Sequence, residues 1–413
     1  MSRRRMENRS VVIEATVSPP GVRLPDRLMR SPLKIVIGNA SLAQYPEGGG
    51  LWSCFLQHLL GLHALGHEVS WLEILRRSGN PIIDEARVRL FLERMATCGL
   101  DGQCMVLLCD PGAPALPERC DLRGMSAAAA ARRIGDADLL WNFSCAVREP
   151  LLGRFRRRAL IDGDPGEIQV SALTSDLGID GHNVLFTAGL NVGSPDGRTP
   201  TLGREWIPFR QFVHLSLWPI PAPPSGAPFT SITQWSWWEL WWNGEVLETG
   251  KRAAYLHVLD LPRRTSEPIE LAVNLHPNDQ TGDRELLLDH GWRLVHPHDR
   301  ARSPEQYRSY IAASRGEICC PKPIHCKLRT GWFSDRSAAF LASGRPVIAR
   351  RTGQEDHLPT GTGLVTFEGV EEAACAVNEV AGNYATHARA ARAFAEAYLN
   401  ATDVLRAMLE RCA

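Results

Sequence analysis

The stretch RTGWFSDRSAAFLASGRPVIARRTGQEDHLPTGTGLVTF, residues 329–367, decides the fold of this chain. Ser334 and Asp335 are residue types that cap a first helical turn, and the apolar residues after them give a helix a buried face. Gly344 and Pro346 end that helix, and the sequence PVIA then predicts a short buried strand. A turn and a second apolar strand follow. The stretch therefore predicts a strand-helix-strand unit of the α/β class.

Glycine-bearing loops flank this unit on both sides of the predicted helix. Such loops present backbone N–H groups to an anion, and the positive end of the helix dipole adds to the attraction. We expect the loops and the first helical turn to form a binding site for a phosphate-bearing ligand that includes Arg329, Gly331, Asp335, Arg336, Thr352 and Gly353.

Arg336 carries a positive charge in the first helical turn, where the helix dipole is already positive. It therefore needs an anion, and a guanidinium can hold two phosphate oxygens at once. The alternative is a salt bridge to Asp335 or Asp356.

The segments LASGRPVIARRTG and LPTGTGLV resemble the donor-binding segment of the GT-B glycosyltransferases, EAMACGxPVIAxxxGGxxEVxxxGxxGLLV. The resemblance implies two Rossmann-like, doubly wound parallel-sheet domains that face a cleft, with C-terminal helices that cross back. The family's ribose-binding glutamate falls on Ala339 here. Asp335 lies one turn earlier on the same helix face and is the expected replacement. A Rossmann-like unit without a ligand is the alternative.

The rest of the chain alternates predicted strands and helices, which is typical of doubly wound parallel sheets. Apolar segments at 33–40, 104–110 and 136–145 are predicted strands of a first sheet, and a second sheet begins at 229–235. The expected organisation begins with a flexible basic extension over 1–31 and an acceptor domain over 32–218. A proline-rich linker over 219–228, a donor domain over 229–395 and a helix that returns to the first domain over 396–413 follow. Met29, within the extension, is a second possible start.

Polar residues of the first domain follow predicted strands or precede its first helix. Gly48, Gly49 and Gly50 would let a substrate approach the backbone closely, or form a plain flexible loop. Asn142 and Ser144 lie at a strand's carboxyl end, where open α/β sheets bind ligands. Asp162 and Asp164 are the candidate catalytic pair, for acceptor binding or as a base, although Asp164-Pro165-Gly166 is also a good turn sequence.

In the second domain, Gln234 and Trp235 follow the first predicted strand, where the GT-B resemblance places the donor. Trp237, Trp238, Trp241 and Trp242 crowd the same loop, and a Trp can stack on a sugar or a base. Lys322 and Lys327 follow a later strand and are expected to contact the phosphates. Cys319, Cys320, His325 and Cys326 lack the spacing of a zinc site, so no metal is expected.

Composition narrows the class of protein. The 413 residues have a formal net charge of +0, which gives no reason to expect nucleic acid or an anionic membrane as a partner. No apolar run approaches the ~18 residues of a membrane helix, and the N-terminus lacks the apolar core of a signal peptide. Eleven irregularly spaced cysteines favour reduced thiols and a cytoplasmic location.

The residues and the resemblance together predict transfer of a sugar from a nucleotide-diphosphate sugar to a small-molecule acceptor, with no further cofactor. A homodimer is one option for the assembly. Helix amides and cations would stabilise the departing diphosphate, which would remove the need for a metal. The first domain shows no basic amphipathic helix, so a small molecule is favoured over a lipid. A GT-B sugar-nucleotide epimerase is one alternative. A catalytically inactive GT-B partner, suggested by Ala339, is the other.

Overall fold

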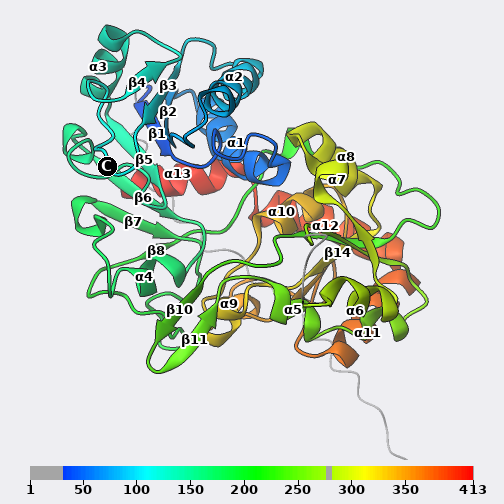
Figure 1. Cartoon of the computed structure of the whole chain (residues 1–413). Helices are drawn as coiled ribbons and strands as arrows, with labels where there is room; N and C mark the ends of the chain where they lie inside the picture. The colour runs from blue at the N-terminus through cyan, green and yellow to red at the C-terminus, as the bar shows by residue number, and fades with distance from the viewer. Residues whose placement is uncertain (1–30, 276–280, 413) are drawn as a thin grey trace, which may run out of the picture. The chain divides into compact units, whose positions relative to one another are not determined.

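The structure is a computed structural model that describes residues 31–275 and 281–412. The predicted basic extension over 1–31, with Met29, therefore falls almost entirely outside the described residues. Figure 1 shows the arrangement of the elements.

An eight-stranded sheet forms the N-terminal half of the described chain. Its strand order is β4-β3-β2-β1-β5-β6-β7-β8, and only β4 is antiparallel to its neighbour. The strands are β1 Lys34–Asn39, β2 Glu68–Arg76, β3 Cys104–Cys109, β4 Asp121–Arg123, β5 Leu139–Phe143, β6 Arg158–Asp162, β7 Val184–Thr187 and β8 Ile207–Pro208. The central strands are apolar almost throughout because helices cover both faces of the sheet.

The helices of this half are α1 Gly49–Ala64, α2 Pro81–Thr97, α3 Ala127–Gly135 and α4 Glu167–Ser171. Helix α2 was not expected, although its start carries a clear signal. Asn80 caps it by accepting the N–H groups of Ile82 and Ile83, and Pro81 occupies the first helical position, which needs no N–H donor.

A six-stranded sheet forms the C-terminal half, with the order β13-β12-β9-β14-β15-β16. Its strands are β9 Phe229–Thr233, β12 Ile269–Val273, β13 Arg293–Val295, β14 Gly316–Cys319, β15 Val347–Arg350 and β16 Leu364–Phe367. In both sheets the first strand lies near the centre and the next two strands extend to one side of it. The other side begins with β5 in the first sheet and with β14 in the second. This is the Rossmann order, and it confirms the two predicted doubly wound parallel sheets.

The helices of the C-terminal half begin with α5 Arg252–Leu256, α6 Asp283–Asp289, α7 Pro297–Ala301, α8 Pro304–Ala313 and α9 Pro323–Lys327. They continue with α10 Asp335–Ala342, α11 Val370–Gly382, α12 Tyr384–Tyr398 and α13 Ala401–Arg411. Helix α10 starts and ends as its sequence predicts. The hydroxyl of Ser334 accepts the N–H of Arg336 at 3.1 Å, and Gly344 adopts φ 65° after the last turn.

An antiparallel hairpin, β10 Glu239–Trp242 and β11 Glu245–Glu248, replaces the expected tryptophan-rich loop. Asn243 and Gly244 connect its strands and have φ values of 52° and 79°. Positive φ at both turn residues is the requirement of a type I′ turn, for which Asn-Gly is the favoured sequence. The dipeptide was a usable signal for this hairpin.

Helix α13 returns to the N-terminal half, as predicted. Ala401 donates its N–H to the carbonyl of Val213 at 3.0 Å, and Leu405 packs against Gly61 of α1 so closely that a Cβ there would lie 2.4 Å from it. Leu405, Met408 and Leu409 belong to the same buried cluster as the core of the first sheet.

Cys109 and Cys120 form a disulfide, which corrects the expectation that every thiol is reduced. The cause is local: β4 pairs antiparallel with the end of β3 and holds the two Cα atoms 4.7 Å apart.

Candidate functional site

The candidate site lies at the carboxyl ends of β9 and β14, the two central strands of the second sheet. The strand order reverses between them, and open α/β sheets bind ligands at such a switch point. Three cations follow these strands or begin the next helix: Lys251, Lys322 and Arg336.

Arg336 is bonded inside the C-terminal half. Its guanidinium donates to Glu317 Oε1 at 2.5 Å and to the carbonyl of Ile232 at 2.6 Å, and its side chain is 10% exposed. Burial disfavours its charge, but Glu317 outweighs burial and raises the pKa of Arg336 above its usual range. The anion that Arg336 needs is therefore Glu317, and neither Asp335 nor Asp356 pairs with it. The N–H groups of its guanidinium are bonded within the protein and are not open to a phosphate.

Lys251 was missed by the sequence analysis and is the cation with unused capacity. It is 8% exposed, its Nζ lies 5.5 Å from the ring centroid of Trp332, and its ammonium has no hydrogen bond or ion pair with any residue that the structure describes. Burial, and then the charge of Arg336, lowers the pKa of Lys251 to about 8. A buried ammonium without a counter-ion is suited to an anionic ligand.

Lys322 joins the two halves. Its ammonium donates to Asp164 Oδ1 at 2.9 Å and to Glu167 Oε1 at 2.6 Å. Burial raises the pKa of Glu167 to about 7, whereas for Asp164 the charge of Lys322 outweighs burial and lowers the pKa. The structure therefore brings together one predicted donor residue and one predicted catalytic residue, with Asp164 held ionised.

His325 is fully buried beside this ion pair. Its ring stacks on Trp332 with centroids 4.6 Å apart, and Nδ1 lies 3.2 Å from the carbonyl oxygen of Pro165. A carbonyl only accepts, so Nδ1 carries the proton and Nε2 has a free lone pair. That Nε2 has no partner in the described residues and lies 3.9 Å from Asp164 Oδ1. Burial lowers the pKa of His325 to about 3, which keeps the ring neutral.

Asp162 and Asn142 lie in the interior of the first sheet, and Asp162 is only two residues from Asp164. Asp162 accepts hydrogen bonds from Gln169, Thr187 and the N–H of Asp164, and burial raises its pKa to about 6. Asn142 bonds both backbone groups of Val147, and its amide nitrogen lies 2.9 Å from His182 Nε2. Both side chains are buried and fully used, so neither is placed to touch a substrate.

The two glycine loops of the deciding stretch contact the N-terminal half instead of forming an open anion cradle. The N–H of Gly331 donates to Thr352 O at 2.8 Å, that of Thr352 to Gln354 at 2.5 Å and that of Gly353 to Glu355 at 3.1 Å. A Cβ on Gly331 would lie 2.7 Å from the backbone nitrogen of Asn191. These amides are already engaged, and the glycines permit close packing between the halves.

The glycines before α1 also have a packing role. A Cβ on Gly49 would lie 2.4 Å from the carbonyl oxygens of both Ala301 and Ser303, and one on Gly50 would lie 3.1 Å from the ring of Tyr307. Backbone of the C-terminal half thus occupies the approach expected for a substrate. Gly48 precedes the helix as its N-cap.

The remaining predicted residues are scattered around the site. Trp235 is buried and donates to Asp283 at 2.9 Å, whereas Gln234 and Ser144 are exposed. Lys327 donates to the carbonyl of Val246 in β11 at 2.9 Å, and Arg329 pairs with Asp356 at 2.8 Å. These contacts are all within the protein.

Asp335 opens α10 and is half-buried. Burial raises its pKa, and its charge in turn helps to raise the pKa of Cys54 in α1, after burial itself. Ala339, one turn later, is buried in the core and offers no polar group.

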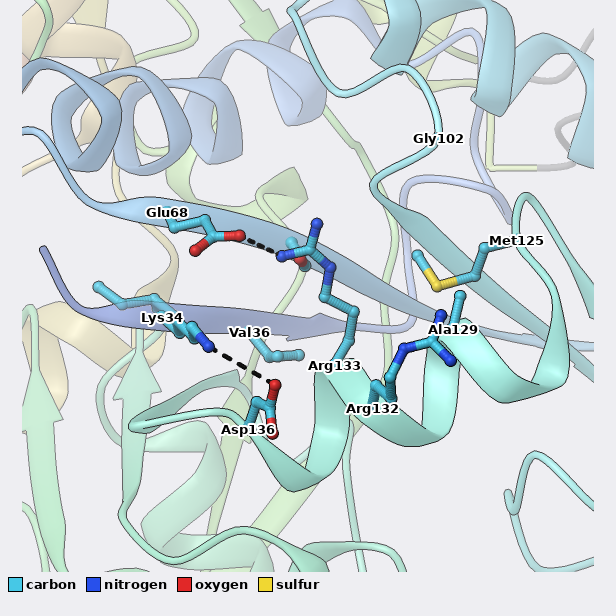
Figure 2. Close-up of a pocket in the computed structure, with 11 residues that line it drawn as sticks. Lys34, Val36, Glu68, Gly102, Met125, Ala129, Arg132, Arg133 and Asp136 are labelled. Atoms are coloured by element: carbon cyan, nitrogen blue, oxygen red, sulfur yellow. Dashed lines mark hydrogen bonds and ion pairs between the residues drawn. The ribbon is translucent and has the colours of Figure 1, made fainter.

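A separate cavity of about 390 Å³ lies at the amino ends of β1 and β2 in the first sheet (Figure 2). Ion pairs close it: Arg133 with Glu68, and Lys34 with Asp136 at 3.5 Å. Four of its five charged side chains are therefore paired with one another, and Arg132 is the one without an ion pair among the described residues. Within the described ranges, no group of His, Cys, Asp and Glu is arranged to hold a metal ion, and none of the helices there has the length and apolar character needed to span a bilayer.

No protein-family model and no curated protein sequence matches this chain. Solved structures do match its fold. HepE of Anabaena, in complex with UDP and glucose, is 14% identical with a TM-score of 0.54, and the match covers 92% of this chain and 99% of that one. Sucrose-phosphate synthase of Thermosynechococcus elongatus is 12% identical with a TM-score of 0.54, covering 92% and 98%. AviGT4, a glycosyltransferase involved in avilamycin A biosynthesis, is 14% identical with a TM-score of 0.51, covering 92% and 97%. The chain thus has the GT-B fold of nucleotide-sugar glycosyltransferases.

Proposed function

We propose that this protein is a glycosyltransferase that uses a nucleotide-diphosphate sugar as its donor. One observation carries the proposal: Lys251 is a buried ammonium without a counter-ion in the part of the chain that the structure describes, and it lies at the switch point of a Rossmann sheet. HepE, which shares the fold, holds UDP and UDP-glucose in its structures. A diphosphate supplies the anion that Lys251 lacks.

The residues around Lys251 fit the two reacting groups. Lys251, with Lys322 nearby, would stabilise the diphosphate as the bond to the sugar breaks. The carboxylate of Asp164, whose side chain is 51% exposed, would accept a hydrogen bond from a hydroxyl group of donor or acceptor. Asp164 is held ionised by Lys322 and is therefore a weak base, so we assign it positioning of a hydroxyl. The proton released by the acceptor hydroxyl would pass to the departing diphosphate.

Titration of UDP into the wild type and into Lys251→Met tests the donor half of the proposal. We expect calorimetry to show affinity weakened by ~1.5–3 kcal/mol, the range for hydrogen bonds to charged groups. Lys327→Ala is the matched control, since that ammonium bonds Val246 O outside the cluster. Equal UDP affinity in the wild type and in Lys251→Met would contradict the assignment.

The positive charge of Lys251 and Lys322 also supports transfer without a metal. Release of free sugar or of UDP from UDP-glucose should therefore persist in excess EDTA at the rate seen without it. Loss of turnover in EDTA and its return with added Mg²⁺ or Mn²⁺ would contradict metal independence.

The inactive GT-B partner remains the second candidate, because Ala339 places no polar group where the family's glutamate would lie. A partner of this kind would show no UDP-dependent rise in melting temperature, since only a ligand that binds the folded state shifts the midpoint.

A further inference from the structure

Three tryptophans of the β10–β11 region are exposed to solvent. Trp237, Trp238 and Trp241 are 42%, 51% and 70% exposed, and the rings of Trp237 and Trp238 lie with centroids 4.6 Å apart. Exposed aromatic side chains grouped in this way mark a binding surface more often than a failure of packing. We call residues 236–249 with these rings the tryptophan hairpin.

The hairpin is anchored on its other face, so the exposed rings do not belong to its core. Leu240 and Trp242 pack in a cluster with Val170, Leu247 and Ile324, which lie in or beside α4, β11 and α9. Side chains alternate along a strand, and this alternation directs Glu239 and Trp241 to the opposite face. Figure 1 shows the hairpin next to α4 and α9, the helices that carry Glu167 and His325.

The base of the hairpin is continuous with the candidate site. The N–H of Thr249 donates to Trp238 O at 3.3 Å, and the N–H of Lys251 donates to Trp235 O at 3.0 Å. A Cβ on Gly250 would lie 2.9 Å from the backbone nitrogen of Trp237. The exposed rings therefore begin next to the residue that carries the free ammonium.

The charge of the hairpin limits what can bind there. Residues 236–249 contain Glu239, Glu245 and Glu248 and no Lys, Arg or His. Glu239 and Glu248 lie directly opposite each other in the ladder, and none of the three has an ion-pair partner among the described residues. Like charges in such a pair repel, and they would also repel phosphates of nucleic acid or of anionic lipids. Carboxylates do accept hydrogen bonds from hydroxyl groups.

We propose that the tryptophan hairpin binds a neutral saccharide, which makes the acceptor a carbohydrate. Sugar rings would lie on the faces of Trp241 and of Trp237 and Trp238, and their hydroxyls would donate to Glu239 and Glu248. This inference rests on the proposed function, since it names the acceptor of the same site. It goes beyond that function because it names the chemical class of the acceptor.

The test measures binding of malto-, cello- and chito-oligosaccharides of three to five rings, by tryptophan fluorescence and calorimetry. We expect at least one series to bind the wild type, and Trp241→Ala or Trp237→Ala/Trp238→Ala to lose tenfold or more in affinity. UDP affinity of the same variants should stay within twofold of the wild type. Ile82→Ala, an exposed apolar residue of α2, is the control and should change neither.

Several results would overturn the inference. The first is that the tryptophan variants bind saccharide as well as the wild type does, and the second is that a wild type that binds UDP binds no saccharide. The third is that the protein sediments with phosphatidylcholine vesicles in a way that depends on Trp241. The fourth is that the wild type is a dimer that Trp241→Ala dissociates. Saccharide and UDP binding are measured separately. A protein that binds saccharide through the hairpin but not UDP supports the inference and overturns the donor proposal.

Discussion

The two halves share one strand order but use the polar residues at their strand ends differently. In the first sheet, Asn142 and Asp162 bond to residues of their own half and have no free capacity. In the second sheet, Arg336 is equally used, but Lys251 and His325 Nε2 are left without partners in the described residues. A shared strand order therefore does not give the polar residues at the strand ends the same role in both sheets. We assign the donor to the second half because Lys251 and His325 lie there, beside the carboxyl ends of its central strands.

The largest expected effect tests whether Arg336 belongs to the interior. Arg336→Met removes the partner of Glu317, which is fully buried and already has one oxygen without a hydrogen bond. Breaking a buried pair from one side costs ~3–5 kcal/mol, so the free energy of unfolding in urea should fall by that amount.

Arg351→Met is the control for Arg336, since its pair with Glu372 is exposed and should contribute ~0–1 kcal/mol. The double variant Arg336→Met/Glu317→Met should regain much of the loss. Unchanged stability with weakened UDP binding would instead place Arg336 beside Lys251, among the ligand contacts.

The next effect concerns Gly49, where the two halves meet. Gly49→Ala would place a Cβ 2.4 Å from two backbone oxygens, and overpacking of this kind costs ~1–3 kcal/mol. Thermal unfolding measures the loss. Gly135→Ala, with open space around its Cβ, should gain ~0.4–1 kcal/mol. A stable Gly49→Ala that has lost substrate binding would restore the substrate role that the sequence predicts.

The pH dependence of UDP binding tests the free ammonium directly. The pKa of Lys251 is about 8, so UDP affinity should hold below pH 8 and decline above it, by at most ~10-fold per pH unit. The decline should be absent in Lys251→Met. If UDP affinity declined equally with pH in the wild type and in Lys251→Met, the decline would come from the titration of another group.

The free energy of unfolding should change with pH in the opposite direction to UDP affinity, because of the same Lys251 ammonium. The folded pKa of about 8 lies below the 10.5 that is usual for a lysine, so the unfolded chain holds the proton more tightly between these values. The buried charge therefore destabilises the fold below pH 8, and this cost disappears as pH rises toward 10.5. Lys251→Met should be more stable than the wild type at pH 7, with a difference that shrinks by pH 10.

The smallest expected effect separates the two aspartates of the first half. Asp162→Asn loses one acceptor of an internal network and should cost ~1 kcal/mol without changing turnover, whereas Asp164→Asn should lower turnover. The pKa of Asp162 is raised to about 6, so the wild type should gain stability as pH falls through 6 toward 4, and Asp162→Asn should not. Equal loss of turnover in both variants would show that Asp162 also acts in the candidate site.

Much of the fold was readable from local sequence, and less of the site was. Caps and glycines around α10 predicted that helix and its flanking strands, and Asn243-Gly244 would have given the missed hairpin. Lys251 was not readable because its burial depends on Trp332, which lies far along the chain. Asp162 and Asp164 are two residues apart, and only the packing of Gln169 and Thr187 decides which one is interior.

The return of α13 to the first half bears on how the chain is made. Because Leu405, Met408 and Leu409 complete the core beneath α1, that core stays open while the ribosome translates the whole C-terminal half. Nascent chains normally fold their leading domain first, but here the leading domain must wait for residues 401–411 to emerge. Stop codons or frameshifts before this helix would therefore release chains with exposed apolar surface, which are natural substrates for chaperones and proteases.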